Sequence, residues 1–296
     1  MVTDTEAALP WRRRPPREVE AFVSAAARRA AAAAGVDPAS IAGTGANGRV
    51  TRDDVLRQAV GHDRGDEIVP FNNIRKRAAK MLLASKQTSA HSLCVVSVDY
   101  SAVEEVRRAV RAEWRAREGF ALTYLPFVAR AAVDALRTYP RINASVDGDA
   151  LVVHRAVNLG IAVDLDYQGL VVPVVRDADG LRLRALARAI NDVATRARAR
   201  KLTPDDLAGG TFTVTNPGAS GTWISFPIIN QPQVGIVATD GVSKQVVADE
   251  RGRLEIAPVG HLCLTFDHRA LDGAYAGAFL DRLREIVETR DWNTEF

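Results

Sequence analysis

The stretch Leu264-Thr265-Phe266-Asp267-His268-Arg269-Ala270-Leu271-Asp272-Gly273 decides both the fold and the chemistry expected of this chain. An apolar run with strand character, residues 262–266, ends abruptly in charged residues. After Gly273 apolar side chains recur at spacings of three and four, which predicts a helix. His268 is therefore expected on a turn between a strand and a helix, a rigid setting that suits precise placement.

The residue types in this turn indicate proton transfer. The unperturbed pKa of histidine, about 6.5, lies near neutral pH, so His268 can accept and return a proton. Asp272 follows four residues later, and we expect a cation to fix its carboxylate and so hold the loop. A solvated turn whose histidine and aspartate only cap the following helix would carry the same residues. The other motifs of the chain decide between the two interpretations.

Composition limits the classes of protein to consider. With 296 residues and 47% hydrophobic content, the chain can bury a large core in one or two domains. The net charge of +3 comes without a long basic stripe, which argues against nucleic-acid binding. Apolar runs stay well below about 18 residues and no signal peptide is evident, so we expect a cytoplasmic protein without membrane contact. Cys94 and Cys263 lie in apolar runs and are expected as buried thiols; we assign no metal site.

Changes in composition along the chain predict four parts. They are a disordered tail (1–20), a small helical domain (21–60), a charged linker (61–67) and a larger α/β domain (68–296).

The small domain shows clear helix signals. An Ala-rich helix is expected from Ser24 to Ala34 and is stopped by Gly35. A Gly-rich loop at 43–49 follows, and Thr51 with Asp54 resembles a capping box for a second short helix.

Helical and strand patterns alternate in the larger domain. A helix with an apolar face is predicted at 73–86, and Ser101 with Glu104 is expected to cap another. Further helices are predicted at 124–137 and 183–200, with a last one after Gly273. Strands are predicted at 93–98, 150–153, 157–163, 170–175, 211–215, 234–238 and 261–266. This pattern is typical of an α/β fold with a mixed sheet and packed helices.

Six motifs in order resemble the catalytic domain of the dihydrolipoamide acyltransferase component of 2-oxoacid dehydrogenase complexes. They are Ile74-Arg75-Lys76, Asn143-Ala144-Ser145, Gly169-Leu170-Val171-Val172-Pro173-Val174, Gly210-Thr211-Phe212-Thr213-Val214-Thr215-Asn216, Pro227-Ile228-Ile229-Asn230-Gln231-Pro232-Gln233 and Asp267-His268-Arg269-Ala270-Leu271-Asp272-Gly273. Residues 35–37 and 43–50 resemble that family's peripheral subunit-binding domain. The resemblance implies a chloramphenicol-acetyltransferase-like α/β domain, preceded by a small all-α subunit-binding domain.

The resemblance also implies a reaction, the transfer of an acyl group between a dihydrolipoyl thiol and coenzyme A. His268 matches the family's general base, and Thr215 matches the residue that stabilises the oxyanion. Asp272 matches the aspartate that holds the histidine loop, and we expect Arg75 to pair with it. The residues expected beside the substrate channel are His91, Asn216 and Ser225.

Family members build each site from two subunits, so a homotrimer is expected. The family often forms cubic or dodecahedral cores through an apolar C-terminal tail. The C-terminal segment 289–296 is short and polar, and we therefore do not expect such a core. Arg28 and Arg49 match arginines that bind dehydrogenase components of the complex.

Three features leave the substrate open. None of the lysines lies in the context of a lipoyl attachment site. Either the chain is truncated, or the lipoyl group is supplied in trans by a separate lipoyl-carrying protein, or free dihydrolipoamide or another acyl carrier serves it. Met81 stands where the family commonly has Arg, and Ala219-Ser220 replaces a bulkier pair, which leaves the acyl group undecided. The alternatives are an acyltransferase with a diverged acceptor, an amine or a carrier thiol, and a noncatalytic scaffold that recruits dehydrogenase subunits through residues 24–60.

Overall fold

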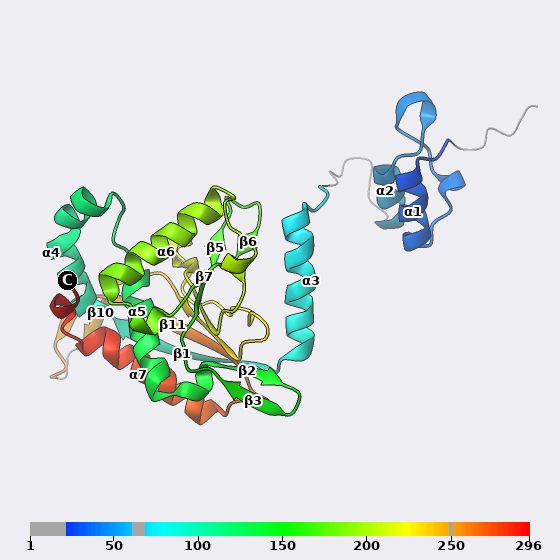
Figure 1. The fold of residues 1–296 in the computed structure, drawn as a ribbon. Coiled ribbons are helices and arrows are strands. Elements are labelled where there is room, and N and C mark those ends of the chain that lie inside the picture. The colour runs from blue at the N-terminus through cyan, green and yellow to red at the C-terminus, as the bar shows by residue number, and fades with distance from the viewer. Residues whose placement is uncertain (1–21, 61–68, 249–250) are drawn as a thin grey trace, which may run out of the picture. The chain divides into compact units, whose positions relative to one another are not determined.

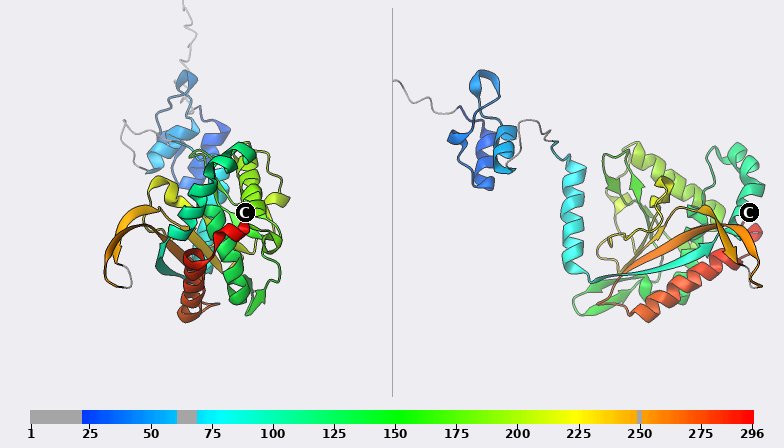
Figure 2. Two further views of the ribbon diagram at one scale, coloured as in Figure 1. Left: turned by 90° about the vertical axis from the view of Figure 1, so that its left-hand side faces the viewer. Right: turned by 180° about the vertical axis from the view of Figure 1, so that it is seen from behind.

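The computed structural model describes residues 22–60, 69–248 and 251–296, which fold as two compact units (Figures 1 and 2). The units are Met1–Pro70 and Phe71–Phe296, and each has a hydrophobic core of its own. The predicted tail (1–20) and linker (61–67) lie outside the described residues, and the predicted domain boundaries stay predictions.

The first helix of the smaller unit follows the predicted signals closely. Helix α1 spans Ala25–Ala34, and the Ser24 hydroxyl accepts a hydrogen bond from the Ala27 N–H at 3.1 Å. Gly35 ends the helix with φ 66°, a left-handed conformation that glycine adopts without a Cβ clash.

Asp54 organises the second half of this unit. Helix α2 spans Arg52–Val60, and the Asp54 carboxylate accepts hydrogen bonds from the Thr51 N–H at 2.8 Å and the Thr44 hydroxyl at 2.7 Å. The Thr51 hydroxyl in turn accepts from the Asp54 N–H at 3.3 Å, which confirms the predicted capping box. Two 3₁₀ turns, Pro38–Ser40 and Ala46–Gly48, connect the helices. The core beneath them consists of Ala27, Ala31, Ile41, Val50 and Val55.

The larger unit is built on a mixed seven-stranded sheet. The strand order is β1-β11-β9-β8-β4-β7, and β10 pairs with the first part of β11. Strand β8 runs parallel to both β4 and β9, whereas β11 runs antiparallel to β1 and β9. The strands are β1 His91–Asp99, β4 Leu159–Ile161, β7 Val174–Val175, β8 Phe212–Thr215, β9 Gly235–Thr239, β10 Ser243–Ala248 and β11 Leu254–Asp267. Two small hairpins lie outside this sheet, β2 Ala144–Asp147 with β3 Ala150–Val153 and β5 Val163–Asp164 with β6 Leu170–Val171.

Four amphipathic helices enclose the main core. Helix α7 packs along β1 and α5, and α6 packs against α5 (Figure 1). Within the core the Phe127 and Trp292 rings meet edge to face with centroids 5.2 Å apart. None of the helices in the described ranges has the length and apolar content needed to cross a bilayer. The four are α4 Ser101–Glu118, α5 Leu125–Thr138, α6 Leu183–Arg198 and α7 Gly273–Thr289.

Helix α3, Asn73–Thr88, stands at the side of the larger unit, apart from these four helices (Figures 1 and 2). The apolar face predicted for it is only partly buried in this chain, since Ile74 packs against the main core but Met81 is 58% exposed and Leu82 is 44% exposed. Its buried residue is Ser85, whose hydroxyl donates to the Ile229 carbonyl at 2.6 Å. A polar contact near its C-terminal end therefore ties α3 to the rest of the chain.

Several local predictions were wrong. The strands predicted at 157–163 and 170–175 are each divided between the main sheet and the β5–β6 hairpin. Helix α4 begins at Ser101 itself, whose N–H donates to the Asp99 carboxylate at 2.7 Å. Glu104 does not cap the helix, because its carboxylate binds Arg107 at 2.6 Å and accepts from the Tyr124 hydroxyl at 2.8 Å. Strands β2 and β10 were not predicted, since their short polar sequences become strands only through pairing with β3 and β11.

Candidate active site

His268 lies on the turn that leaves β11, as the sequence predicted. Its backbone N–H donates to the Ala90 carbonyl at 2.9 Å, and its exposed ring lies 5.4 Å from the Phe266 ring centroid. The preceding Asp267 is 1% exposed and fixes the turn, because its carboxylate accepts from the Ala90 N–H at 3.2 Å and pairs with Arg269 at 2.7 Å. The imidazole is therefore held on a rigid backbone with its ring facing outward.

The charge of Asp267 is stabilised in place. Burial alone would raise the pKa of its carboxyl, but hydrogen bonds from Arg269, Ser89 and the Ala90 N–H outweigh it and lower the pKa below its ordinary value. Sequence reasoning did not select this residue. The available signal was a charged residue at the last position of an apolar strand, directly before the histidine.

Asp272 and Arg75 lie apart in this single chain. Asp272 is the N-cap residue of α7, its carboxylate is exposed, and its backbone carbonyl accepts from the Ala276 N–H at 3.0 Å. Arg75 instead donates to the Tyr167 carbonyl at 3.0 Å, and its guanidinium lies 5.9 Å from the Phe71 ring centroid. The Arg75–Asp272 pair stays a prediction.

Thr215, the last residue of β8, opens into a cavity of about 500 Å³. The size falls within the range of about 300–1,000 Å³ that is usual for small-molecule sites. The cavity lies between α3, the β6 hairpin and the loop that precedes β9. Its lining residues are Met81, Leu82, Ala84, Ala162, Leu170, Val172, Thr215, Pro217, Ser225, Phe226, Pro227, Ile228, Ile229, Asn230, Gln231 and Ile236.

The strand register separates Thr215 from His268. Thr215 pairs with Ala238, and Ala238 pairs with Cys263 of β11, so His268 lies five residues farther along β11. At about 3.3 Å per residue and about 4.8 Å per strand, the two backbones are roughly 17 Å apart along the strands and 10 Å across them. The resulting separation of about 19 Å is too large for both side chains of one copy to contact one reacting group.

The three residues predicted for the substrate channel have different surroundings. Both ring nitrogens of His91 are used locally, since Nδ1 lies 3.0 Å from the Ser89 carbonyl oxygen and Nε2 accepts from the Ile229 N–H at 3.1 Å. Asn216 follows Thr215, is exposed, and accepts from the Gly218 N–H at 3.0 Å.

Ser225 lines the cavity, and its hydroxyl donates to the buried Asp240 carboxylate at 2.9 Å. The Cys263 thiol also donates to this carboxylate at 3.1 Å. Burial, together with the neighbouring carboxylate, raises the pKa of Cys263 to about 12.

Gln231 is a further structural residue that sequence reasoning did not select. Its amide nitrogen donates to the Ser89 hydroxyl at 2.7 Å and to the Ser85 hydroxyl at 3.2 Å. These bonds fix the loop that forms one wall of the cavity against the end of α3.

In the smaller unit the two predicted partner-binding arginines are exposed. Arg28 donates to the Val23 carbonyl at 3.3 Å, and the Arg49 guanidinium lies 4.3 Å from the Phe22 ring centroid. Both side chains are thus positioned near α1 while their charges stay accessible to solvent.

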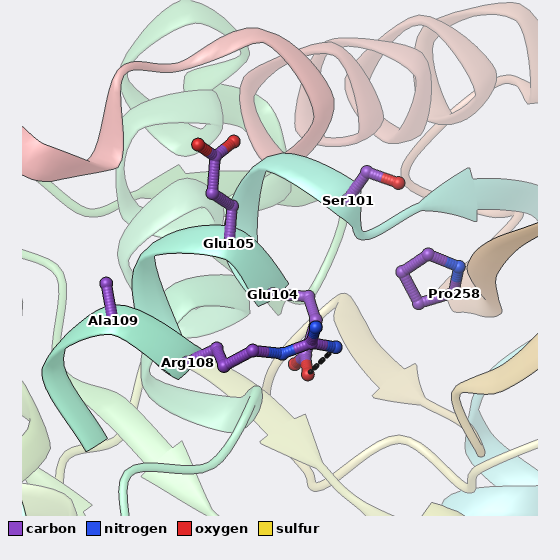
Figure 3. Close-up of a pocket in the computed structure, with 6 residues that line it drawn as sticks. All are labelled: Ser101, Glu104, Glu105, Arg108, Ala109 and Pro258. Atoms are coloured by element: carbon purple, nitrogen blue, oxygen red, sulfur yellow. Dashed lines mark hydrogen bonds and ion pairs between the residues drawn. The ribbon is translucent and has the colours of Figure 1, made fainter. Parts of the chain in front are cut away.

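A second hollow, of about 450 Å³, lies at the start of α4 (Figure 3). Arg108 pairs there with Glu104 at 3.3 Å, an ion pair typical of a solvated helix face. Neither Thr215 nor His268 is among its lining residues, which are Ser101, Glu104, Glu105, Arg108, Ala109 and Pro258.

Comparison with known families now adds to this geometry. The family model of the 2-oxoacid dehydrogenases acyltransferase (catalytic domain) matches residues 63–294. The chain belongs to this acyltransferase family. An e3 binding domain model matches residues 21–56. The family resemblance predicted from the six motifs is therefore confirmed.

Relatives of this acyltransferase cover most of its length. The dihydrolipoyllysine-residue succinyltransferase component of the 2-oxoglutarate dehydrogenase complex of Rickettsia bellii is 37% identical over 268 residues, which cover 86% of this chain and 66% of that protein. The lipoamide acyltransferase component of the branched-chain alpha-keto acid dehydrogenase complex of Bacillus subtilis is 32% identical over 305 residues. The match covers 92% of this chain and 72% of that protein. The chain thus spans about two thirds of the length of these curated relatives.

Solved structures confirm the predicted α/β acyltransferase fold. A probable dihydrolipoamide acetyltransferase from Listeria monocytogenes is similar with a TM-score of 0.73 and 36% identity, covering 76% of this chain and 95% of that one. The cubic core of the pyruvate dehydrogenase multienzyme complex is similar with a TM-score of 0.72 and 32% identity. The match covers 75% of this chain and 91% of that chain.

Proposed function

We propose that this protein transfers an acyl group between the thiol of a dihydrolipoyl arm and the thiol of coenzyme A, as a core component of a 2-oxoacid dehydrogenase complex. One observation carries the proposal. Thr215 opens into an apolar cavity while His268 is exposed about 19 Å away, which supports a site that two copies complete together. Family membership and the names of the relatives support the same reaction.

The proposed reaction begins with a proton transfer. A thiol with a pKa of about 8.5 is only partly ionised at neutral pH, so His268 accepts its proton and produces the attacking thiolate. The thiolate adds to the thioester carbonyl, and the Thr215 hydroxyl donates a hydrogen bond to the oxyanion that forms. When the intermediate collapses, the C–S bond to the departing thiolate breaks and the imidazolium returns its proton to that sulfur.

The two halves come from neighbouring copies in this proposal. A homotrimer places His268 of one copy at the cavity mouth of the next, and cyclic symmetry then completes three equivalent sites. The proposal names a homotrimer and no larger core.

Supporting residues then have distinct roles. Asp267 fixes the histidine turn through Arg269, as its contacts indicate. Asp272 holds the start of α7 and pairs with Arg75 in the assembled site. Asn216 and Ser225 lie beside the substrate channel. His91 accepts a hydrogen bond from the Ile229 N–H and so positions the wall of that channel.

The acyl carrier and the partners complete the proposal. The five lysines of the given sequence lie on α3, after α6 and in β10, and we propose that a lipoyl-carrying domain or protein presents the arm. Arg28 and Arg49 bind an acidic surface of a dehydrogenase component. Both cysteines are free thiols, which is consistent with a cytoplasmic location.

Thioester exchange tests the proposal. The protein is mixed with an acyl-CoA and free dihydrolipoamide, and the release of coenzyme A is followed. We expect turnover that falls by about 10²–10⁴-fold in His268→Ala, the usual contribution of a general base. A noncatalytic scaffold would give no turnover in either protein and would retain binding of dehydrogenase subunits.

A further inference from the structure

The described residues that line the cavity at Thr215 carry no charged side chain. Of the described residues that line it, twelve are apolar, and the other four are Thr215, Ser225, Asn230 and Gln231. An acyl group whose carbonyl contacts the Thr215 hydroxyl must extend along these walls. The chemistry of the walls therefore decides which acyl groups fit, given the acyl-transfer function proposed above.

Two of the four polar side chains already have partners. The Ser225 hydroxyl donates to the Asp240 carboxylate at 2.9 Å. The Gln231 amide nitrogen donates to the hydroxyls of Ser89 and Ser85. A carboxylate at the far end of an acyl chain would find only neutral donors, with no cation in the wall to offset its lost hydration.

Just outside the cavity lie one carboxylate, which disfavours an anion, and one cation, which packs over an aromatic ring. The Asp240 carboxylate is 3% exposed and lies directly behind Ser225, where it would repel a second carboxylate. The Lys86 ammonium lies 5.0 Å from the centroid of the Phe226 ring, outside the set of lining residues. The cation next to His268, Arg269, is already paired with Asp267 at 2.7 Å, so a neighbouring copy would not bring a free charge with this turn.

We propose that the acyl group is an uncharged hydrocarbon chain larger than acetyl and that dicarboxylic acyl groups are excluded. This assignment rests on the proposed function and names its substrate class. It differs from the succinyl group in the name of the Rickettsia bellii relative, at 37% identity. Apolar surface on the acyl chain gains from burial against the walls, whereas a terminal carboxylate loses hydration without a partner.

A donor panel measures the preference. Acetyl-, isobutyryl- and succinyl-CoA are compared by kcat/KM with free dihydrolipoamide as the acceptor. We expect isobutyryl-CoA to exceed acetyl-CoA by about tenfold, because each added carbon contributes binding in an apolar pocket. We expect it to exceed succinyl-CoA by about a hundredfold or more, because burying an unpaired ion is costly.

Variants on α3 separate charge from shape. Met81 lines the cavity and is 58% exposed, so Met81→Arg is expected to fold and to raise the succinyl-to-isobutyryl ratio at least about tenfold. Met81→Gln has similar length without charge and should leave the ratio low. Val246 of β10 is 67% exposed, does not line the cavity and lies outside the exposed face of α3, so Val246→Arg should leave the ratio unchanged. Light scattering checks that all variants keep the assembly of the wild type.

The outcomes are distinct. Comparable kcat/KM for succinyl- and isobutyryl-CoA, or no change of the ratio in Met81→Arg, overturns the assignment. If no donor is exchanged at all, the acyl-transfer proposal fails, and calorimetric binding of S-isobutyryl- and S-succinyl-dihydrolipoamide then tests the cavity by itself. Tighter binding of the isobutyryl compound would still support an uncharged ligand, and equal binding would overturn it.

Discussion

Mixing two inactive variants should restore activity if each site joins two copies. His268→Ala removes the base and leaves the Thr215 cavity intact, whereas Thr215→Ala removes the oxyanion donor and leaves the imidazole. Separately, the variants should lose about 10²–10⁴-fold and about 10²–10³-fold in kcat, respectively. In a mixed trimer, some cavities with Thr215 will meet a copy that keeps His268.

The recovery follows from the strand register and from counting copies. The separation of about 19 Å between the two backbones rules out a complete site within one copy. With random 1:1 mixing, one copy supplies an intact cavity half of the time and its neighbour supplies an intact histidine half of the time. About one quarter of the sites, and hence about one quarter of wild-type kcat, should therefore return.

A second mixture makes the assay decisive. Wild type mixed 1:1 with the double variant should also retain about one quarter of wild-type kcat if sites are shared, but about one half if each copy holds a complete site. Both mixtures are co-expressed and assayed by thioester exchange, and light scattering verifies the trimer. Recovery no greater than the sum of the separate variants would refute the shared site.

Three further results are expected. Asp267→Asn should lower kcat about 10–100-fold with little change in KM, because the charge that holds Arg269 and the histidine turn is lost while the cavity stays intact; steady-state kinetics measures this. Burial alone would raise the pKa of Asp54, but hydrogen bonds from its threonine neighbours lower it to about 2. The smaller unit should therefore keep the stabilisation from Asp54 above about pH 4 and lose it as the pH falls toward 2, as circular dichroism of residues 22–60 would show. Cys263, with its pKa raised to about 12, should resist iodoacetamide at pH 8 until the protein is unfolded, as mass spectrometry would report.

Local signals in the sequence predicted the parts of the fold that depend on neighbouring residues. The helix end at Gly35 and the capping box of Thr51 with Asp54 form as expected, because each needs only a few adjacent residues. The strand predicted to end at Phe266 ends at Asp267, and the helix predicted after Gly273 begins at Gly273, because a change of apolar period marks that boundary directly.

Distances across the sheet could not be obtained in this way. Nothing local shows that Thr215 pairs through Ala238 with Cys263, and this register alone sets Thr215 and His268 about 19 Å apart. The family resemblance identified both residues as site residues but gave no distance between them. Asp267 was not predicted for a related reason, because its hydrogen bond from the Ala90 N–H forms only when β1 pairs with β11.

The exposed face of α3 and the divided site have one physical explanation in the proposed trimer. Apolar periodicity indicates that one face of a helix is buried, but it does not indicate whether the same chain or another copy buries it. Met81, Leu82 and Leu83 remain 44–64% exposed here, beside a cavity whose rim includes the half-exposed Phe226. Soluble proteins seldom leave such a patch open. A neighbouring copy that brings His268 to this rim would cover the patch and complete the site together, so substitutions that break the trimer should abolish turnover even when Thr215 and His268 are both intact.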